Sequence, residues 1–227
     1  MIAFEEQFGV ERANGCLVAF SLPEFRPDAD VTKVEGLSPR EKAFVDTLEP
    51  RRAISFVGGR LALRAVLTRL GAPTYESLPN PRGAPIVPRG YRASISHKDD
   101  IAVAYACVDR GMAVGIDVEV SEPDRSRIAR KVLTEDELEA ISEMTGSTRW
   151  HAILRRFSLK EAVYKAIDPF VERYVGFQEV AVNPTNEADI QVDLRLRTNE
   201  SLDVRCEQFQ RADYILSLAK ARISPPA

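Results

Sequence analysis

The chain has 227 residues, of which 44% are apolar and 29% are charged. This is the composition of an ordinary globular protein, and the length allows one large hydrophobic core or two smaller ones. The formal net charge of −3 argues against a dedicated nucleic-acid-binding protein. No apolar run is long enough to span a membrane, and Glu5 and Glu6 stand where a signal peptide would carry basic residues. We therefore expect a cytoplasmic protein without nucleic-acid or membrane partners, whose core holds three reduced cysteines, Cys16, Cys107 and Cys206.

The predicted elements occur twice along the chain, at an offset of about one hundred residues. In the first half, the order is a strand at 15–20, a capping box from Ser38 to Glu41, a helix over 52–70, and strands at 93–96 and 101–108. In the second half, the order is a strand at 115–120, a capping box from Thr134 to Glu137, a helix over 150–167, and strands at 177–182, 190–196, 202–209 and 214–219.

Chance similarity is the alternative explanation of this repeat. Three features, the first strand, the capping box and the long helix, recur in the same order at nearly the same offset, which favours duplication. We therefore predict an α+β fold with two similar halves, 1–112 and 113–227, each an antiparallel sheet packed on a long helix. Helices and hairpin strands that do not alternate regularly argue against a doubly wound parallel sheet.

Arginines recur along the helix over 52–70. Arg52, Arg60 and Arg64 are spaced by eight and four residues, which keeps them near one face. Arginine suits bidentate phosphate contacts, so this face is a candidate phosphate site; a solvated basic surface is the alternative. Gly58 and Gly59 are costly inside a helix and indicate the close approach of another backbone or a ligand.

The segment that follows this helix contains one of the two histidines. An extended loop, Arg82-Gly83-Ala84-Pro85-Ile86-Val87-Pro88, runs into the strand Ser94-Ile95-Ser96-His97-Lys98. Alternation places Ser94 and Ser96 on one strand face. His97 could donate to a phosphate or cap the turn that follows.

Two carboxylates share one face of the strand over 114–120. Its valines and isoleucine alternate strictly, so Asp117 and Glu119 lie together on the other face, roughly 7 Å apart. Hard oxygen ligands without histidine or cysteine suit Mg²⁺, which completes its shell with water and phosphate oxygens. An amphipathic strand with its acidic face in water is the alternative.

Glu161 lies within an apolar stripe of the helix over 150–167. That stripe is formed at helical spacing by Trp150, Ile153, Leu154, Phe157 and Tyr164. A carboxylate in such a place needs a partner. A local pair with Lys165, one turn on, would supply one. Together with Lys160, these residues could instead hold a metal and an anion.

These segments, in this order, resemble the larger two-domain class of 4′-phosphopantetheinyl transferases, which serve siderophore, peptide and polyketide synthases. The two most diagnostic motifs are Gly115-Ile116-Asp117-Val118-Glu119 and Phe157-Ser158-x-Lys160-Glu161-x-x-x-Lys165. The resemblance spans residues from about 50 to 168 and includes the Arg52 and Gly59-Arg60 helix, Gly83-x-Pro85-x-x-Pro88 and Ser94-Ile95-Ser96-His97.

The resemblance implies a holo-[carrier protein] synthase. Such an enzyme transfers the phosphopantetheine arm of coenzyme A to a serine of an acyl, aryl or peptidyl carrier protein and releases adenosine 3′,5′-bisphosphate. By the family pattern, Mg²⁺, with Mn²⁺ as a possible substitute, would be held by Asp117, Glu119 and Glu161. Glu161, or a water molecule on the metal, would take the serine proton.

The resemblance also implies the contacts to coenzyme A. Phosphate oxygens would be contacted by Lys160 and Lys165, and the 3′-phosphate or diphosphate by Ser96 and His97. The nucleotide side would be bound by Arg52 and Arg60. Some relatives carry a basic residue at the position of Ala84, and Arg82 is the candidate substitute.

A duplicated chain could form within itself an interface that shorter relatives form between subunits. We therefore expect a monomer with one site between the halves, in which the first half binds the nucleotide side and the second holds the metal and docks the carrier. In this scheme Arg60 and Arg64 take the places that Glu161 and Lys165 hold in the second half. Basic and apolar residues in the segment 121–150 would suit an acidic carrier protein.

Two other functions remain open at this point. One is a non-catalytic carrier- or nucleotide-binding module that kept the fold. The other is a metal-dependent nuclease, which also uses acids and lysine around Mg²⁺. Retention of all three acids and both lysines argues against the first, and the charge balance argues against the second.

Overall fold

The computed structural model describes residues 3–12, 15–26, 30–73, 75–109, 111–184, 190–197 and 201–224. The chain forms two compact units, residues 1–110 and 111–227, called here the first and the second unit. Each combines antiparallel strands with a long helix, so the α+β class is confirmed. Within the described ranges, no helix has both the length and the apolar character needed to cross a membrane. All three cysteines are buried and free, as expected.

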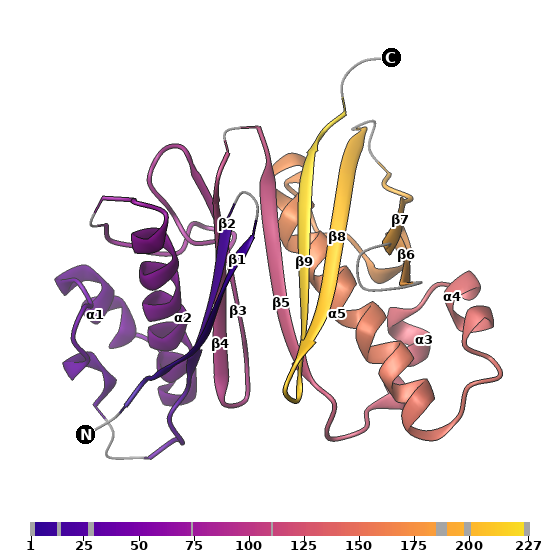
Figure 1. Cartoon of the computed structure of the whole chain (residues 1–227), viewed down its shortest axis with the longest axis horizontal. Helices are drawn as coiled ribbons and strands as arrows, with labels where there is room; N and C mark the ends of the chain where they lie inside the picture. Colours follow the sequence, from indigo (N-terminus) through magenta and orange to yellow (C-terminus); the bar gives the residue numbers. More distant parts are fainter. Residues whose placement is uncertain are drawn as a thin grey trace. The chain divides into compact units, whose positions relative to one another are not determined.

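The first unit is a four-stranded antiparallel sheet in the order β1-β2-β4-β3, covered by the helix α2 (Figure 1). The mid-helix glycines allow this packing. A Cβ on Gly58 would lie 2.1 Å from Leu22 Cδ2, and one on Gly59 would lie 2.8 Å from Ile95 Cγ2. Apolar side chains, and not another backbone as the sequence suggested, therefore make the close approach at these glycines. The elements are β1 (Glu6–Arg12), β2 (Gly15–Ser21), η1 (Val31–Lys33), α1 (Pro39–Val45), α2 (Pro50–Arg69), β3 (Tyr91–Lys98) and β4 (Ile101–Val108).

The second unit has a three-stranded antiparallel sheet in the order β5-β9-β8, a separate hairpin of β6 and β7, and the 26-residue helix α5. The helix packs on β5 and β9. The elements are β5 (Ala113–Val120), η2 (Ser126–Ile128), α3 (Ala129–Val132), α4 (Glu135–Ala140), α5 (Gly146–Val171), η3 (Phe177–Glu179), β6 (Val180–Pro184), β7 (Ile190–Leu194), β8 (Leu202–Arg211) and β9 (Tyr214–Ile223).

Both capping boxes form as predicted. Ser38 Oγ accepts from Glu41 N at 3.1 Å, while Glu41 Oε2 accepts from Ser38 N at 2.7 Å. Thr134 and Glu137 repeat this exchange at 3.4 and 2.7 Å. These contacts satisfy amide donors that the first turn of a helix otherwise leaves without partners. They fix where α1 and α4 begin.

The two units repeat one topology. In each, a first strand leads into helices, and a hairpin returns so that its second strand lies between the other two, as β2-β4-β3 and β5-β9-β8. The acid of each capping box also reaches a cation on the long helix 23 residues later. Glu41 pairs with Arg64 at 2.8 Å, and Glu137 with Lys160 at 2.6 Å. The internal duplication is therefore visible in topology and in side-chain contacts.

These ion pairs correct the helix alignment expected from the sequence. They relate α2 to α5 by an offset of 96, so that Arg60 and Arg64 correspond to Arg156 and Lys160. Gly59 and Arg155 also differ by 96. Gly59 packs beside Ile95 of β3, and Arg155 Nε donates to Gln208 Oε1 of the equivalent strand β8 at 2.6 Å. Apolar residues in a helix recur every three to four positions and so fit several registers. The buried ion pair selects one.

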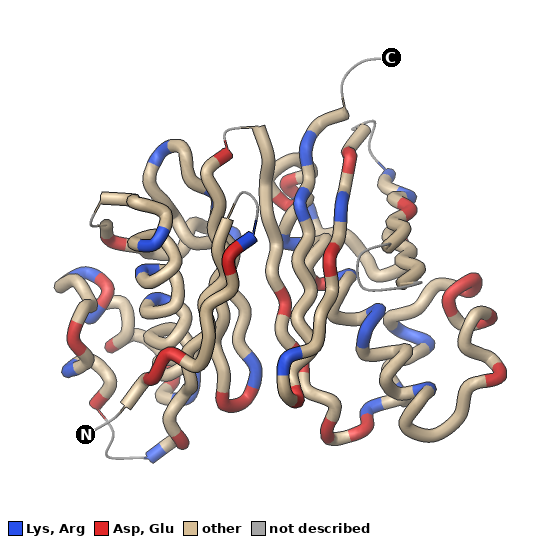
Figure 2. The backbone as a smooth tube through the Cα atoms, viewed as in Figure 1, with Lys and Arg blue, Asp and Glu red and all other residues tan. Residues whose placement is uncertain are grey.

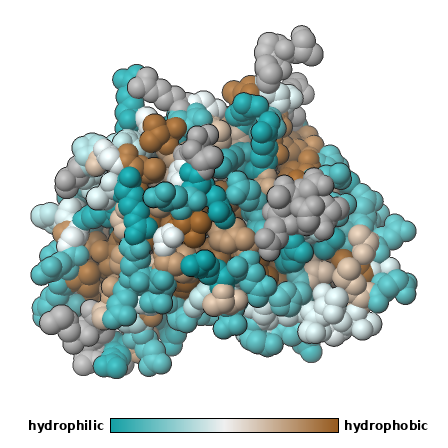
Figure 3. Space-filling model, viewed as in Figure 1, coloured by the Kyte–Doolittle hydropathy of each residue, from teal (hydrophilic) through white to brown (hydrophobic). Residues whose placement is uncertain are grey.

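Acidic and basic residues are interspersed along both units (Figure 2), and the face shown in Figure 3 mixes hydrophilic with hydrophobic residues. The charged residues that stand out are those that are buried, because charges are almost never fully buried without partners. The candidate site is therefore sought among them. They are Glu41, Arg60, Asp117, Glu119, Glu137, Arg156 and Lys160.

Candidate active site

Gly115 determines how closely α5 packs on β5. An added Cβ at this position would lie 1.9 Å from the carbonyl oxygen of Ala162 and 2.8 Å from the amide nitrogen of Ala166. The helix backbone therefore rests directly on the strand, which only glycine permits. Because strand side chains alternate, Asp117 and Glu119 lie on the same face as Gly115. Both acids consequently face α5.

The two strand carboxylates are buried against that helix. Asp117 is 5% exposed and Glu119 is 9% exposed. The alternative of an acidic strand face turned toward water is therefore wrong. A buried carboxylate requires compensating charge or hydrogen bonds. The helix α5 supplies a compensating positive charge, that of Lys165.

Lys165 reaches from α5 across to β5. Its Nζ donates to Ile116 O at 2.8 Å and to Asp117 Oδ1 at 2.9 Å. The side chain is 31% exposed, so it lies at the border between the helix–strand interface and solvent. This ammonium group compensates part of the negative charge on the strand.

Glu161 lies one helical turn before Lys165 and is half-buried. Its pKa is raised, chiefly by burial, then by the negative charge of Asp117 and, to a smaller extent, that of Glu119; Lys165 opposes this rise. Three carboxylates thus converge where β5 meets α5. Their mutual repulsion identifies a place where added positive charge would be favourable.

The three acids have the chemistry of a hard-cation site. Within the described ranges, no three histidine, cysteine, aspartate or glutamate side chains are already arranged to hold a metal ion. Carboxylate oxygens are nevertheless the ligands that Mg²⁺ prefers. Burial is the largest cause of the raised pKa of Glu161, and the charges of Asp117 and Glu119 add a repulsion that a divalent cation would relieve. The donor set of Asp117, Glu119 and Glu161 therefore fits such an ion.

Lys160 does not belong to this group. It is fully buried, and its Nζ donates to Glu137 Oε2 at 2.6 Å, to Val132 O at 2.8 Å and to Phe177 O at 2.9 Å. An ammonium group has three donors, and all three are used within the protein. The structure therefore argues against the expected phosphate contact of Lys160. The residue instead joins α5 to α4 and to the segment before β6.

In the first unit, Arg52 and His97 form a pair. Arg52 Nη1 lies 2.6 Å from His97 Nε2. A guanidinium group can only donate, so His97 Nε2 accepts and the proton of the neutral ring is on Nδ1. Ile95 and His97 share the β3 face that meets α2, whereas Ser96 is buried on the opposite face. His97 and Ser96 thus point to different sides of the strand.

The other arginines on this helix are engaged within the first unit. Arg60 Nε donates to Ser77 O at 2.6 Å, and its guanidinium lies 4.2 Å from the centre of the Phe56 ring. Burial lowers the pKa of Arg60 to about 10, and Glu41 opposes the shift. Arg64 pairs with Glu41. A solvated basic face is therefore wrong for Arg60 and Arg64 but agrees with the exposed Arg52.

Arg82 lies in the exposed loop between α2 and β3. Its backbone amide and that of Ala84 donate to Asn80 Oδ1 at 2.9 and 3.0 Å, and Gly83 has φ +87°. The loop is therefore a turn organised by Asn80. These backbone contacts do not join Arg82 to another predicted site residue.

The structure thus brings together Asp117, Glu119, Glu161 and Lys165 in one unit, and Arg52 with His97 in the other. The sequence reasoning missed the roles of Gly115 and Glu137. A signal for Glu137 existed in the capping box, since its acid lies 23 residues before Lys160 just as Glu41 precedes Arg64. Gly115 gave a weaker signal, as a glycine inside a strand pattern.

Comparison with known proteins finds relatives for both units. Residues 113–219 match the 4′-phosphopantetheinyl transferase superfamily, and residues 40–107 match the 4′-phosphopantetheinyl transferase N-terminal domain. The 4′-phosphopantetheinyl transferase Svp of Streptomyces mobaraensis is 33% identical over 163 residues, 69% of this chain and 65% of that protein. The 4′-phosphopantetheinyl transferase Npt of Nocardia iowensis is 32% identical over 145 residues, 63% of this chain and 64% of that protein. The aligned parts span just under two thirds of these relatives.

A solved structure with partial likeness is a holo-(acyl-carrier-protein) synthase from Bacillus anthracis in complex with CoA (3′,5′-ADP). It is 19% identical, with a TM-score of 0.41, over 49% of this chain and 96% of that chain.

Proposed function

We propose that this chain, which belongs to the 4′-phosphopantetheinyl transferase superfamily, moves the 4′-phosphopantetheine arm of coenzyme A to a serine of an apo carrier protein. The serine oxygen forms a bond to the β-phosphorus of coenzyme A. The bond from that phosphorus to the oxygen shared with the α-phosphate breaks, and adenosine 3′,5′-bisphosphate leaves. The observation that supports this most is the convergence of three carboxylates and Lys165 where β5 meets α5.

Asp117, Glu119 and Glu161 would hold the divalent cation, Mg²⁺ or Mn²⁺. When bound there, the ion would offset the negative charge of the diphosphate, which is the main requirement of phosphoryl-type transfer. Lys165 is held by Ile116 O and Asp117 at the solvent border of the site, so it adds a fixed positive charge near the leaving phosphate.

Glu161 is the proposed base for the serine proton. In the metal-free protein, burial and then the charges of Asp117 and Glu119 raise the pKa of Glu161, and a carboxylate within hydrogen-bond reach of a hydroxyl group can remove its proton. The same carboxylate would take the proton as the oxygen–phosphorus bond forms. Its side chain is half-buried, so it is reachable from solvent.

Arg52 and His97 are proposed to bind the nucleotide end of coenzyme A. Both donate to anions readily, and their pairing at 2.6 Å holds the two side chains together at the beginning of α2. We propose that Ser96, Arg60 and Arg82 play at most supporting parts, since the contacts described above engage them or place them elsewhere.

The carrier protein is proposed to dock on the segment between β5 and α5. The basic side chains there are exposed and complement the acidic surface expected of a carrier. One chain holds both units, so we expect a monomer to be active, and we expect it to act in the cytoplasm. The exposed basic residues are Arg125, Arg127, Arg130 and Lys131.

The test is to incubate the protein with coenzyme A, Mg²⁺ and a panel of apo carrier proteins, and to weigh each carrier by mass spectrometry. The proposal predicts that at least one carrier gains the mass of one phosphopantetheine arm. Carrier binding without any mass gain would favour a non-catalytic module. Cleavage of DNA in the same buffer would favour a nuclease.

A further inference from the structure

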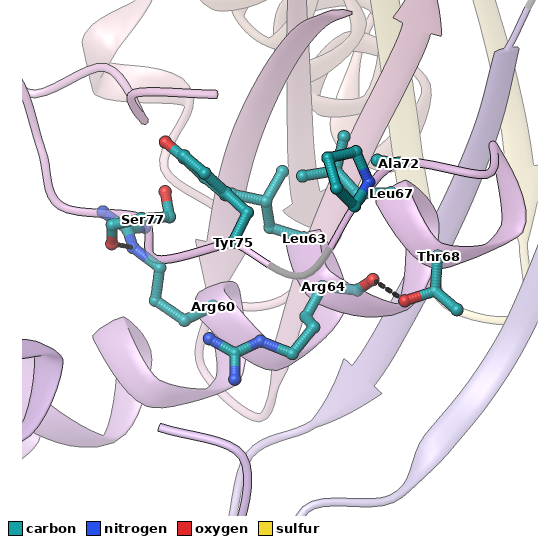
Figure 4. A pocket seen from close by; sticks show the side chains of 9 residues that line it. Arg60, Leu63, Arg64, Leu67, Thr68, Ala72, Tyr75 and Ser77 are labelled. Carbon is teal, nitrogen blue, oxygen red and sulfur yellow. Dashed lines mark hydrogen bonds between the residues drawn. The ribbon is translucent and has the colours of Figure 1, made fainter. Parts of the chain in front are cut away.

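The first unit contains a pocket along the second half of α2 (Figure 4). Its volume is about 180 Å³, and the segment after α2 forms its other wall. Tyr75 lies on one side, and Arg64 and Thr68 on the other. The lining residues are Arg60, Leu63, Arg64, Leu67, Thr68, Ala72, Pro73, Tyr75 and Ser77.

This pocket lies apart from the Arg52–His97 pair. Sixteen residues of helix separate Arg52 from Thr68, which is about 24 Å at 1.5 Å per residue. Arg60 is the lining residue closest to Arg52 along the helix. The apolar part of the pocket, at Leu67, Ala72 and Pro73, is thus remote from the proposed nucleotide contacts.

The duplicated helix shows what fills this place in the second unit. With the offset of 96 set by the ion pairs, Arg64 corresponds to Lys160 and Thr68 to Tyr164. The Tyr164 ring packs on Phe177 at 5.5 Å between centroids, and its hydroxyl donates to Gly176 O at 3.3 Å. An aromatic ring, that of Tyr164, therefore occupies the position beside the buried ion pair in the second unit, where the first unit has the small side chain of Thr68.

The size of the pocket agrees with one missing ring. An engineered apolar cavity of about 150 Å³ binds benzene. Leu63, Leu67, Ala72 and Pro73 supply apolar walls, and the Tyr75 ring offers an aromatic face. Aromatic pairs are favourable in offset or edge geometry.

The charges around the pocket favour an anionic group on that ring. Arg60 and Arg64 share one buried carboxylate, Glu41, and the nearby Glu76 is paired with Arg40, which leaves one positive charge in excess. Arg64 donates to both oxygens of Glu41 through Nη2, and its side chain also lines the pocket. In the second unit the corresponding cation, Lys160, also donates to the carbonyl oxygen of Phe177. A ligand in the first unit would supply the equivalent acceptor to Arg64.

We propose that this pocket is a binding site for a small molecule with one aromatic ring and one carboxylate. The ring occupies the space between Tyr75, Pro73 and Thr68, and the carboxylate accepts from Arg64. The proposal does not depend on the transferase activity, because all of its residues belong to the first unit, whereas the proposed metal ligands and base belong to the second.

Benzoate is the probe for the first test. Amide spectra of the isotope-labelled protein are recorded during titrations with benzoate, benzyl alcohol and acetate at millimolar concentrations. We expect saturable shifts for residues 60–77 with benzoate, affinity at least about tenfold weaker for benzyl alcohol, which lacks the charge, and no saturable shift with acetate, which lacks the ring. Absence of saturable shifts with benzoate, or equal binding of acetate, would overturn the proposal.

Filling the pocket is the second test. Thr68→Tyr places a ring where the second unit has Tyr164, and Ala72→Phe adds a ring to the pocket wall. Each variant should weaken benzoate binding at least about tenfold while its spectrum remains that of a folded protein. Thr47→Tyr and Ala43→Phe make the same changes at exposed positions of the α1 region and should leave affinity unchanged. Full benzoate affinity in both filled variants would contradict the assignment. If one variant fails to fold, the other and the wild-type titration still decide.

Discussion

Glu161 lies in surroundings that are unfavourable to its own charge. Burial is the largest cause of its raised pKa, and two carboxylates on β5 add to it. A folded-state pKa above the unfolded value means that the folded protein binds the proton more tightly. Stability is therefore lost as pH rises from the unfolded pKa through the folded pKa. Above the unfolded pKa, this raised pKa of Glu161 therefore lowers the stability of the metal-free protein, as expected of a residue retained for chemistry.

We predict that Glu161→Gln stabilises the metal-free protein at neutral pH while reducing transfer. Thermal unfolding in the presence of a chelator should give a higher Tm for the variant than for the wild type near pH 7.5. The difference should be much smaller near pH 4, where Glu161 of the wild type is largely protonated in both the folded and the unfolded state. Transfer should fall by about a hundredfold to ten-thousandfold, the usual contribution of a general base. A lower Tm at neutral pH would show that Glu161 is a structural partner instead.

Lys160 is the opposite case, a charge kept for structure. It is fully buried and its three acceptors come from three parts of the second unit. Lys160→Met leaves the Glu137 carboxylate buried without its cation, which should cost about 3–5 kcal/mol in free energy of unfolding. Urea denaturation measures this cost.

The matched double variant is Glu137→Gln with Lys160→Met, in which no unpaired charge remains. It should recover part of the lost stability. If Lys160→Met kept full stability but raised KM for coenzyme A, the phosphate contact expected from the sequence would be correct after all.

At the scale of elements, the contact between β5 and α5 positions the candidate site. Gly115→Ala should push the helix away, because the added Cβ would lie 1.9 Å from Ala162 O. Overpacking of this kind costs about 1–3 kcal/mol. It should also separate Lys165 and Glu161 from Asp117, so transfer should fall more than about tenfold, a size that misplacement of catalytic groups produces.

Gly176→Ala is the control for that change. Gly176 has φ −78°, and the nearest atom to an added Cβ is Glu179 Oε1 at 3.8 Å, so this variant should retain stability and transfer. Kinetics and urea denaturation of both variants check the prediction. Wild-type activity in Gly115→Ala would mean that the helix position does not matter for the reaction.

Most elements were predictable because local patterns determine them. The capping boxes at Ser38 and Thr134 place two helix starts, and strict alternation places β5. The edge strand β1 was not predicted, since its side chains are mostly exposed and give little apolar alternation. The helix register and the role of Lys160 were also not predictable, because both depend on contacts with residues distant in sequence, above all Glu41 and Glu137.

At the scale of the whole molecule, duplication has produced only one set of site acids among the described residues. Counting from each hairpin turn shows which strand residues correspond. Val18 pairs with Ala104, which is three residues after Ile101 at the start of β4, and Asp117 pairs with Ser217, which is three residues after Tyr214 at the start of β9. Val18 therefore corresponds to Asp117. By the same register Phe20 corresponds to Glu119. The helix offset of 96 makes Ala65 the counterpart of Glu161. The first unit repeats the fold and its buried ion pair, while the three site acids are replaced by apolar residues.

The rate of carrier modification by Asp117→Asn tests most sharply whether the acids at β5 and α5 hold the cation that transfer requires. The rate is measured by mass spectrometry of the carrier, with a second acid-to-amide variant as the control. Asn keeps the shape of Asp117 and an acceptor for Lys165 but removes the charge that would hold the cation. We expect the rate for Asp117→Asn to fall at least about a hundredfold, comparable to removing one electrostatic catalytic group. Asp213→Asn, in the exposed turn between β8 and β9, should modify the carrier at the wild-type rate. Equal rates for the two variants would contradict the account.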